Sequence, residues 1–302
     1  MKLPSVNIKN LLEAGVHLGH KTFRWNPKMN KFIFGSKKSI HIIDLVQTLE
    51  LINVALQKIH ECISSGGKIL FVSTKKQAAG SVANLAKETS QFYVNHRWLG
   101  GMLTNWKTIS NSIKKYKNLT SDLKKENTGF TKKEILKMGI QRDKLERSLG
   151  GISEMKKIPD MIFIIDTNME DLAVKESIKL NIPIVAILDT NSDPVGIDYP
   201  IPGNDDARRA INLYCDLIKE TIIDAQSNIS KAAIQENKDE NQFRTEKDSK
   251  DSKVKKIIAI AVDKTVNKEK ITPKKKEKIK VVKKISKSII SKVKSLTAKK
   301  AK

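Results

Sequence analysis

Four short apolar runs constrain this chain more than any other feature of its sequence. Ile69 to Val72, Met161 to Ile165 and Ile184 to Leu188 are apolar at every position, and Phe92 to Val94 is a shorter run of the same kind. Helical patterns separate the runs. Because a strand that is apolar on both faces must be covered on both faces, the sequence predicts a parallel sheet between two layers of helices. The expected fold class is α/β, a three-layer α/β/α domain of flavodoxin or Rossmann type.

Further elements follow from periodicity and from glycine and proline positions. Phe32 to Phe34 and Ser39 to Ile43 have the composition of short strands, and two prolines confine Pro200 to Pro202 to the edge of a sheet. Helices are predicted where apolar residues recur at steps of three or four. The predicted helices cover residues 8–14, 45–63, 77–89, 170–180 and 205–225.

A long insertion separates two of the predicted strands. Apolar positions recur from Trp106 to Leu123 and again from Ile135 to Leu149, with a turn near residues 127–130. This pattern predicts a coiled-coil hairpin of two antiparallel helices. Cations on its outer faces outnumber acids, which favours contact with phosphates or an acidic protein over a merely solvated face. The expected organisation is a globular domain formed by residues 1–104 and 156–228, an inserted hairpin at 105–155 and an extension at 229–302.

The net charge indicates the kind of partner. The chain carries 57 Lys+Arg against 33 Asp+Glu, a formal net charge of +24. Residues 231–302 hold 24 of these cations and 9 of these acids, so that +15 belongs to the extension and +9 to the remainder. A polyanionic partner is expected for both parts. The extension from residue 229 is lysine-rich and poor in apolar groups over its first part, so we expect a disordered basic tail.

Two connections combine cations with aromatic rings. One follows His20, and the other runs from Gln91 to Trp106, where Gly100 and Gly101 allow close approach of another backbone. Cations and rings in this arrangement are typical of phosphate contact and base stacking. For Trp25 and Trp98, packing into the core is the slightly favoured alternative. The candidate RNA-binding residues, with those of the hairpin, are Lys21, Arg24, Trp25, Asn26, Lys28, Lys31, His96, Arg97, Trp98, Asn105, Lys107, Lys114, Lys115, Lys132 and Lys133.

Five motifs point to one protein family. They are AGVHLGH, RWNPKM, NHRWLGGMLTNW, LDTNSDP and IPGNDDA, and they occur in that family's order. Over residues 5–226 the chain resembles bacterial small-subunit ribosomal protein two. The resemblance implies a structural, cytoplasmic protein that binds 16S rRNA where the head of the small subunit meets the body. It also implies neighbouring small-subunit proteins as partners, including the large one that captures messenger RNA, and no homo-oligomer.

An enzyme is the main alternative from another class. Asp166 and Asp189 follow two predicted parallel strands, where α/β enzymes place ligand-binding groups, and Asp193 is nearby in sequence. However, the strand-to-helix turns contain neither GxGxxG nor GxxxxGK[ST], and no serine elbow or cysteine-histidine pair is evident. We therefore expect no catalytic residue. A second rival is a free RNA chaperone driven by the lysine tail.

The acidic residues have two further interpretations. Asp189, Asp205 and Asp206 can cap helices and accept hydrogen bonds from loop amides, which is the favoured role. Alternatively they hold a structural divalent ion together with His17 or His20, which are three residues apart. His17 is the histidine assigned to this candidate metal site. No cofactor is expected to be required.

The sequence gives no sign of a membrane partner or of an oxidising compartment. No run of about 18 apolar residues occurs, and the first ten residues lack the apolar stretch of a secretory signal. No transit peptide is evident either. Cys62 and Cys215 are too few and too far apart for a disulfide framework, which favours a reducing cytoplasm.

Overall fold

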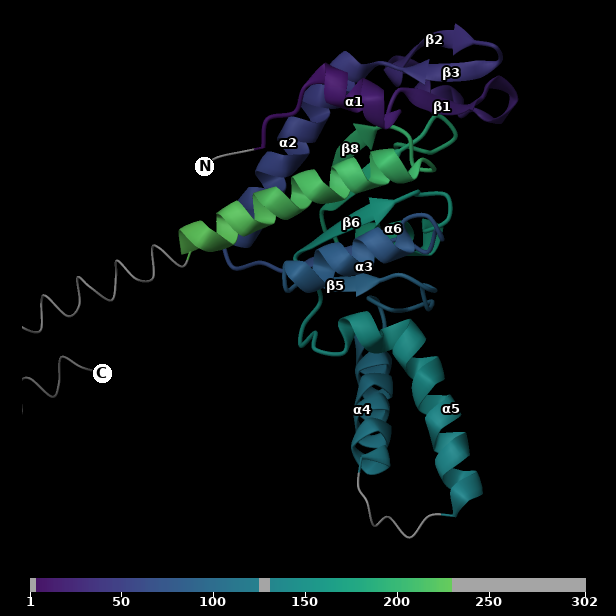
Figure 1. The fold of residues 1–302 in the computed structure, drawn as a ribbon, viewed down its shortest axis with the longest axis vertical. Coiled ribbons are helices and arrows are strands. Elements are labelled where there is room, and N and C mark those ends of the chain that lie inside the picture. Colours follow the sequence, from purple (N-terminus) through teal and green to yellow (C-terminus); the bar gives the residue numbers. More distant parts are fainter. Residues whose placement is uncertain (1–3, 125–130, 230–302) are drawn as a thin grey trace, which may run out of the picture. The chain divides into compact units, whose positions relative to one another are not determined.

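A parallel sheet lies at the centre of the computed structural model, which describes residues 4–124 and 131–229. The strand order is β5-β4-β6-β7-β8, and every neighbouring pair is parallel. Figure 1 labels β5, β6 and β8 of this sheet. The four apolar runs are confirmed as strands, and the proline-containing strand lies at an edge as expected. The strands are β4 (Ile69–Val72), β5 (Phe92–Val94), β6 (Met161–Ile165), β7 (Ile184–Leu188) and β8 (Tyr199–Pro202).

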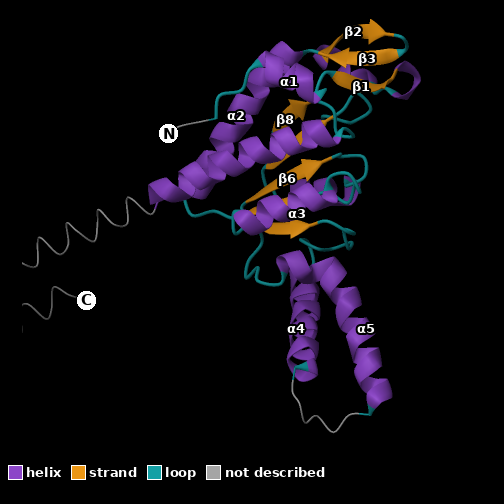
Figure 2. Cartoon of the chain, viewed as in Figure 1, coloured by secondary structure: helices purple, strands orange, loops and turns teal. Residues whose placement is uncertain are grey.

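Helices cover both faces of this sheet. Side chains alternate along β4, so Ile69 and Phe71 join one apolar cluster and Leu70 and Val72 join the other. The first cluster includes side chains of α1 (Ile8–Ala14), α2 (Leu45–Ser64), α3 (Ala79–Glu88) and the helix at 208–229. The second includes α6 (Asp171–Lys179) and the start of the hairpin. The predicted α/β class, with helices flanking a parallel sheet, is confirmed (Figure 2).

The strand order creates a switch point at the carboxyl ends of β4 and β6. After β4 the chain adds β5 on one side, and after β5 it crosses to add β6 on the other. This is the flavodoxin-like order, in which the crevice beside the reversal is open to polar side chains. Lys75 follows β4 and Asp166 follows β6, so both lie at this point.

A separate antiparallel sheet holds the first three strands, in the order β1-β3-β2. They are β1 (Leu18–Lys21), β2 (Ile33–Lys37) and β3 (Ile40–Ile43). Two short 3₁₀ helices, η1 (Thr22–Arg24) and η2 (Pro27–Phe32), connect β1 to β2. The sequence did not predict β1, which is only half-buried. Lys38 and Ser39 turn the β2-β3 hairpin with φ of 50° and 59°, a tight turn that usually has Asn-Gly.

The insertion forms two helices, α4 (Trp106–Leu123) and α5 (Lys132–Leu149), which pack against each other. Ile109 and Ile113 of α4 are buried at their base. The helices are where the periodicity predicted them, whereas their coiled-coil packing stays a prediction. The predicted turn at 127–130 and nearly all of the extension at 229–302 lie outside the described residues.

The base of the hairpin contacts the sheet edge closely. The 3₁₀ helix η3 (Gly150–Ile152) follows α5 and lies against β5. A Cβ at Gly151 would lie only 2.1 Å from the carbonyl oxygen of Tyr93. Only glycine allows this approach of η3 to β5.

The last helix begins at 208, three residues later than predicted. The side chain of Asn204 accepts hydrogen bonds from the amides of Asp206 and Ala207. Because Asn204 supplies these bonds, Asp205 and Asp206 do not act as the cap and their carboxylates point elsewhere. No helix in the described ranges is both long and apolar enough to cross a bilayer.

Candidate functional site

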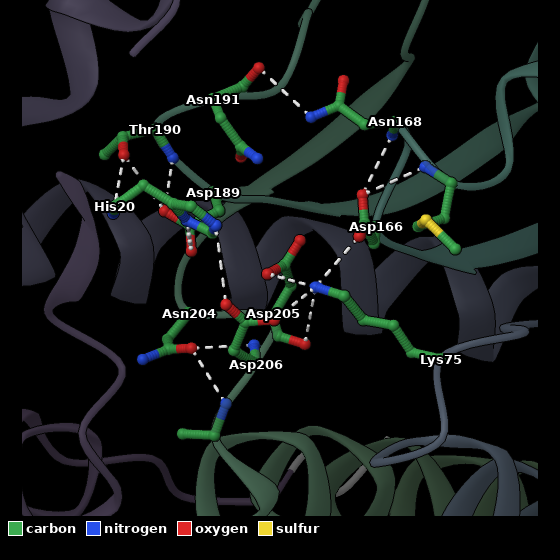
Figure 3. A network of polar contacts seen from close by, with 12 residues as sticks. His20, Lys75, Asp166, Asn168, Asp189, Thr190, Asn191, Asn204, Asp205 and Asp206 are labelled. Carbon is green, nitrogen blue, oxygen red and sulfur yellow. Dashed lines mark hydrogen bonds and ion pairs between the residues drawn. The ribbon is translucent and has the colours of Figure 1, made fainter. Parts of the chain in front are cut away.

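Lys75 forms ion pairs with three carboxylates at the switch point of the parallel sheet. Its Nζ lies 2.9 Å from Asp166, 2.7 Å from Asp205 and 2.7 Å from Asp206, and Figure 3 shows these contacts as a fan around the ammonium group. Asp166 is held there in a left-handed backbone conformation, with φ of 68°. Lys75 was not among the residues predicted from the sequence, although a lysine three residues after a buried strand was a usable signal.

His20 joins this cluster from the small sheet. Its Nδ1 lies 2.9 Å from Asp189 Oδ2, and its Nε2 lies 3.5 Å from Asp206. The backbone amide of His20 also donates to Thr190 Oγ1 at 2.9 Å. The small sheet is therefore attached to the end of β7 by polar contacts (Figure 3).

The choice of His17 for this cluster was wrong, because the structure places His20 there. His17 directly precedes β1 and His20 lies within it. In an extended chain, residues an odd number of positions apart point in opposite directions, so that the two imidazoles do not share a face. His20, Asp189, Asp205 and Asp206 each offer a ligand atom, and these atoms all lie within 4.8 Å of one another.

Burial and mutual repulsion alter the protonation of this cluster. Burial raises the pKa of Asp205 to about 7, and the charges of Asp189 and Asp166 add to this effect while Lys75 opposes it. The pKa of His20 is raised, mainly by its hydrogen bond to Asp189. Burial lowers the pKa of Lys75, but the surrounding carboxylates outweigh it and the net shift is upward. The ammonium of Lys75 therefore remains charged and compensates part of the buried negative charge.

A second buried carboxylate organises the stretch between β5 and α4. Glu176 of α6 is only 9 % exposed, and its two oxygens accept five hydrogen bonds from this stretch. The donors are Trp98 Nε1 at 3.1 Å, Gly101 N at 2.7 Å, Leu103 N at 2.9 Å, Thr104 N at 3.0 Å and Thr104 Oγ1 at 3.1 Å. We call residues 98–104 the Glu176-bound loop. Glu176 was not predicted as a functional residue, although an acid on the apolar face of a helix is a usable signal.

This anchor explains the role of Trp98. Its side chain is 6 % exposed and its indole N–H is bound by Glu176. In this conformation Trp98 offers no free face for a nucleotide base. Packing, the alternative favoured for Trp98 in the sequence analysis, agrees with this burial.

A basic groove lies beside the Glu176-bound loop. His96 and Arg97 are exposed, and with Lys144 and Arg147 of α5 they line a pocket of about 440 Å³. Asp143 is the acid in its lining, and it accepts hydrogen bonds from Arg142. Chain segments almost 50 residues apart are thus brought together to form a cationic surface. Lys144 and Arg147 were counted among the outward-facing cations of the hairpin but not among the candidate RNA-binding residues, since periodicity does not show which end of α5 meets the loop.

The amino-terminal basic connection is exposed but partly tied to the core. Lys21 and Arg24 face solvent, whereas Lys28 forms an ion pair with Asp193 at 2.7 Å. Trp25 is half-buried, with its ring centroid 5.2 Å from that of His41. Two further candidates have local contacts. They are Asn26, which caps η2 by accepting from the Lys28 amide, and Lys31, whose Nζ lies 4.6 Å from the Phe32 ring centroid.

The remaining candidates lie on the hairpin or at its start. Asn105 is exposed and accepts a hydrogen bond from Thr108 Oγ1 at 2.9 Å. The five hairpin lysines are exposed, and none of them forms an ion pair with an acid in the part of the chain that the structure describes. They are Lys107, Lys114, Lys115, Lys132 and Lys133.

Comparison with known proteins agrees with the resemblance in the motifs. A model of the family described as Ribosomal protein S2 matches residues 11–225. The small ribosomal subunit protein uS2 of Parvibaculum lavamentivorans is 55% identical over 233 residues, which are 77% of this chain and 92% of that protein. Those of Phenylobacterium zucineum and Caulobacter vibrioides are each 58% identical over 224 residues, 74% of this chain and 76% and 84% of theirs. The chain therefore belongs to the ribosomal protein S2 family, and it is a structural, non-enzymatic component of the small ribosomal subunit.

Proposed function

We propose that the chain binds the backbone of 16S rRNA at the junction of head and body, chiefly through its hairpin and the adjoining basic groove. The small subunit, a cytoplasmic particle in bacteria, contains ribosomal RNA and other ribosomal proteins as the available partners. We further propose that the chain helps to dock the large subunit protein that captures messenger RNA. The location and the docking role rest on family membership.

The observation that carries the RNA proposal is the set of five exposed hairpin lysines without an acidic partner in the described ranges. Each phosphate that a lysine neutralises releases condensed counterions, which favours binding and makes it dependent on salt. Such contacts fix position on the RNA and carry little base specificity. The exposed Lys21 and Arg24 of the amino-terminal connection would add to the same interaction.

The acidic cluster is not part of the proposed RNA-binding surface, because carboxylates repel phosphates. We propose that His20, Asp189, Asp205 and Asp206 hold a structural divalent cation. The donor set fits, since imidazole nitrogen and carboxylate oxygen are ordinary ligands of Zn²⁺. In addition, Asp205 Oδ2 is buried and has no hydrogen-bond partner in the described part of the chain. Bound there, the ion would link the small sheet to the end of β7.

The RNA proposal is tested by sedimentation of tagged full-length chains in cell extract. The variant changes Lys114, Lys115, Lys132 and Lys133 to Gln. The control removes the same charge by changing four lysines that already have acidic partners, Lys9, Lys58, Lys175 and Lys219. We expect the wild-type chain and the control variant to migrate with the small subunit at moderately high salt. The hairpin variant should dissociate from the subunit at a lower salt concentration than either of them. Equal salt sensitivity of the two variants would contradict the hairpin assignment.

The ion proposal is tested by calorimetric titration of chelator-treated full-length protein with Zn²⁺ and with Mg²⁺. Asp205→Asn should abolish saturable binding. Asp193→Asn, which changes a carboxylate at the same sheet edge outside the cluster, should leave it unchanged. Failure of both ions to bind the unchanged chain would contradict the proposal.

A further inference from the structure

We propose that Glu176 is the positioning residue of a phosphate site formed by Arg97, Lys144 and Arg147. The ligand class is the phosphodiester backbone of ribosomal RNA. This inference rests on the proposed function and deepens it, because it names the groove and the buried residue that shapes it.

The groove has the charge and form that a phosphate requires. Arg97 lies in the connection that follows β5, whereas Lys144 and Arg147 come from the base of α5, and the pocket between them measures about 440 Å³. Its acid, Asp143, is already engaged by Arg142. A guanidinium offers a planar fork that matches two phosphate oxygens, so two arginines and a lysine around one opening favour a phosphate group over a neutral ligand.

Glu176 controls one wall of this groove directly. Arg97 immediately precedes Trp98, whose indole is fixed by Glu176 Oε1 at 3.1 Å. If the carboxylate were absent, several partly or fully buried donors of residues 98–104 would lose their acceptor, which is costly for buried groups. The loop would then rearrange to find other acceptors, and Arg97 would move with it.

The same carboxylate also controls the other wall. Thr104 donates twice to Glu176 Oε2, and α4 begins two residues later at Trp106. Since α4 packs against α5, the position of the Thr104 backbone helps to set where the base of α5 lies. One side chain of α6 thus places Arg97 and the cations of α5 opposite each other.

Only an ionised carboxylate fits the five donors. Burial would raise the pKa of Glu176, but the hydrogen bonds from Thr104, Trp98, Leu103 and Gly101 lower it below its ordinary value overall. Glutamine has nearly the same shape, but its NH₂ group would face donors in place of an oxygen. Aspartate keeps both oxygens on a stem that is one carbon shorter. Glu176→Gln and Glu176→Asp therefore separate the loss of acceptors from the loss of length.

The test measures binding of the full-length chain to a 16S rRNA transcript over a series of salt concentrations. Arg97→Ala and Arg147→Ala should each reduce the slope of log affinity against log salt by about 1, as expected for one phosphate contact. Glu176→Gln should reduce it by at least as much, and adding Arg97→Ala to Glu176→Gln should cause no further loss. Glu176→Asp should reduce the slope less than Glu176→Gln does.

Glu170→Gln is the matched control. Glu170 is also buried, directly precedes α6, and accepts a hydrogen bond from the Thr74 amide. Its change should leave the salt slope unaltered, and circular dichroism should show that each variant remains folded. If Glu176→Gln does not fold, Glu176→Asp alone must show the reduced slope and the non-additivity with Arg97→Ala.

Two results would overturn the inference. One is an unchanged slope in the folded Glu176 variants, and the other is full additivity of their effect with that of Arg97→Ala. If instead the unchanged chain binds the transcript but Arg97→Ala and Arg147→Ala do not alter the slope, the groove is not the phosphate site while the proposed function stands. If the unchanged chain does not bind the RNA, the proposed function itself fails.

Discussion

The indole N–H of Trp98 donates a hydrogen bond to Glu176 Oε1 over 3.1 Å. Both side chains are at least nine-tenths buried, and they come from segments 78 positions apart. Trp98 therefore packs inside the protein and does not offer a stacking face to RNA. The buried carboxylate of Glu176 fixes the conformation of the loop, and Arg97 next to Trp98 is exposed to solvent.

Trp98→Phe should lower the free energy of unfolding by about 2 kcal/mol, because a hydrogen bond to a buried charge is lost while most of the apolar contact is kept. Urea unfolding of the full chain would measure it. Trp106→Phe is the control, since the Trp106 indole forms no hydrogen bond with described residues and is only half-buried. An equal loss in both variants would show that ring size, not the Glu176 contact, is responsible.

Lys75→Met should lower the free energy of unfolding by about 3–5 kcal/mol, more than Trp98→Phe, because removing the cation of a buried ionic group leaves its carboxylates uncompensated. Lys76→Met changes an exposed neighbour and should have little effect on the urea midpoint. Adding Asp205→Asn to Lys75→Met should recover part of the loss, because it removes one of the carboxylates left without a counterion. A double variant less stable than Lys75→Met would contradict this account.

The His20–Asp189 contact should make stability depend on pH in the chelator-treated protein. The pKa of His20 is raised in the folded state, mainly by Asp189. The stabilisation is therefore fully present below the unfolded pKa, near 6.5, and is lost as pH rises through the higher folded value. The stability difference between the unchanged chain and His20→Asn should be larger at about pH 5.5 than at about pH 8.5. Urea unfolding at both pH values would measure it, and equal differences would contradict the pairing.

The sequence predicted those features that repeat along the chain. Strands such as Met161–Ile165 and the hairpin helices are confirmed, because continuous apolar runs and 3.6-residue periodicity are local signals. The proline rule also placed β8 at the edge. Two strands of the small sheet were predicted at 32–34 and 39–43, where β2 and β3 lie, but β1 was missed because it is half-exposed. The hairpin of β2 and β3 was not predicted, because its turn at Lys38 and Ser39 lacks the usual Asn-Gly.

The candidate site was predictable only in part. Motifs and charge indicated the basic connections, but the partners of each residue depend on the three-dimensional fold. Glu176 and Lys75 are each one charged residue near an apolar run, and nothing local shows which donors or acceptors they meet. His17 was predicted in place of His20 for the same reason. Residues three apart share a face in a helix but point in opposite directions in an extended strand, and the sequence did not show that β1 is extended.

Two glycines of the hairpin region should respond in opposite ways to the same change. A Cβ at Gly151 would lie 2.1 Å from the Tyr93 carbonyl oxygen and 2.8 Å from its ring, so Gly151→Ala must push η3 away from β5. We expect a loss of about 3 kcal/mol, at the upper end of the usual cost of overpacking. Gly139 lies within α5, where a Cβ would meet nothing within 4 Å. Gly139→Ala should therefore stabilise the chain by about 0.5–1 kcal/mol through helix propensity alone.

Comparing Gly151→Ala with Gly139→Ala shows whether the loss of stability comes from the contact of Gly151 with Tyr93. If any added methyl group destabilised the hairpin, both variants would lose stability. Urea midpoints should shift in opposite directions, and Gly151→Ala should also weaken RNA binding, because the groove residues Lys144 and Arg147 lie in the two turns of α5 before Gly151. If Gly151→Ala were as stable as the unchanged chain, the hairpin base would not be fixed by its contact with Tyr93. The position of the α5 cations would then depend on the packing of α4 against α5 and on the Glu176-bound loop alone.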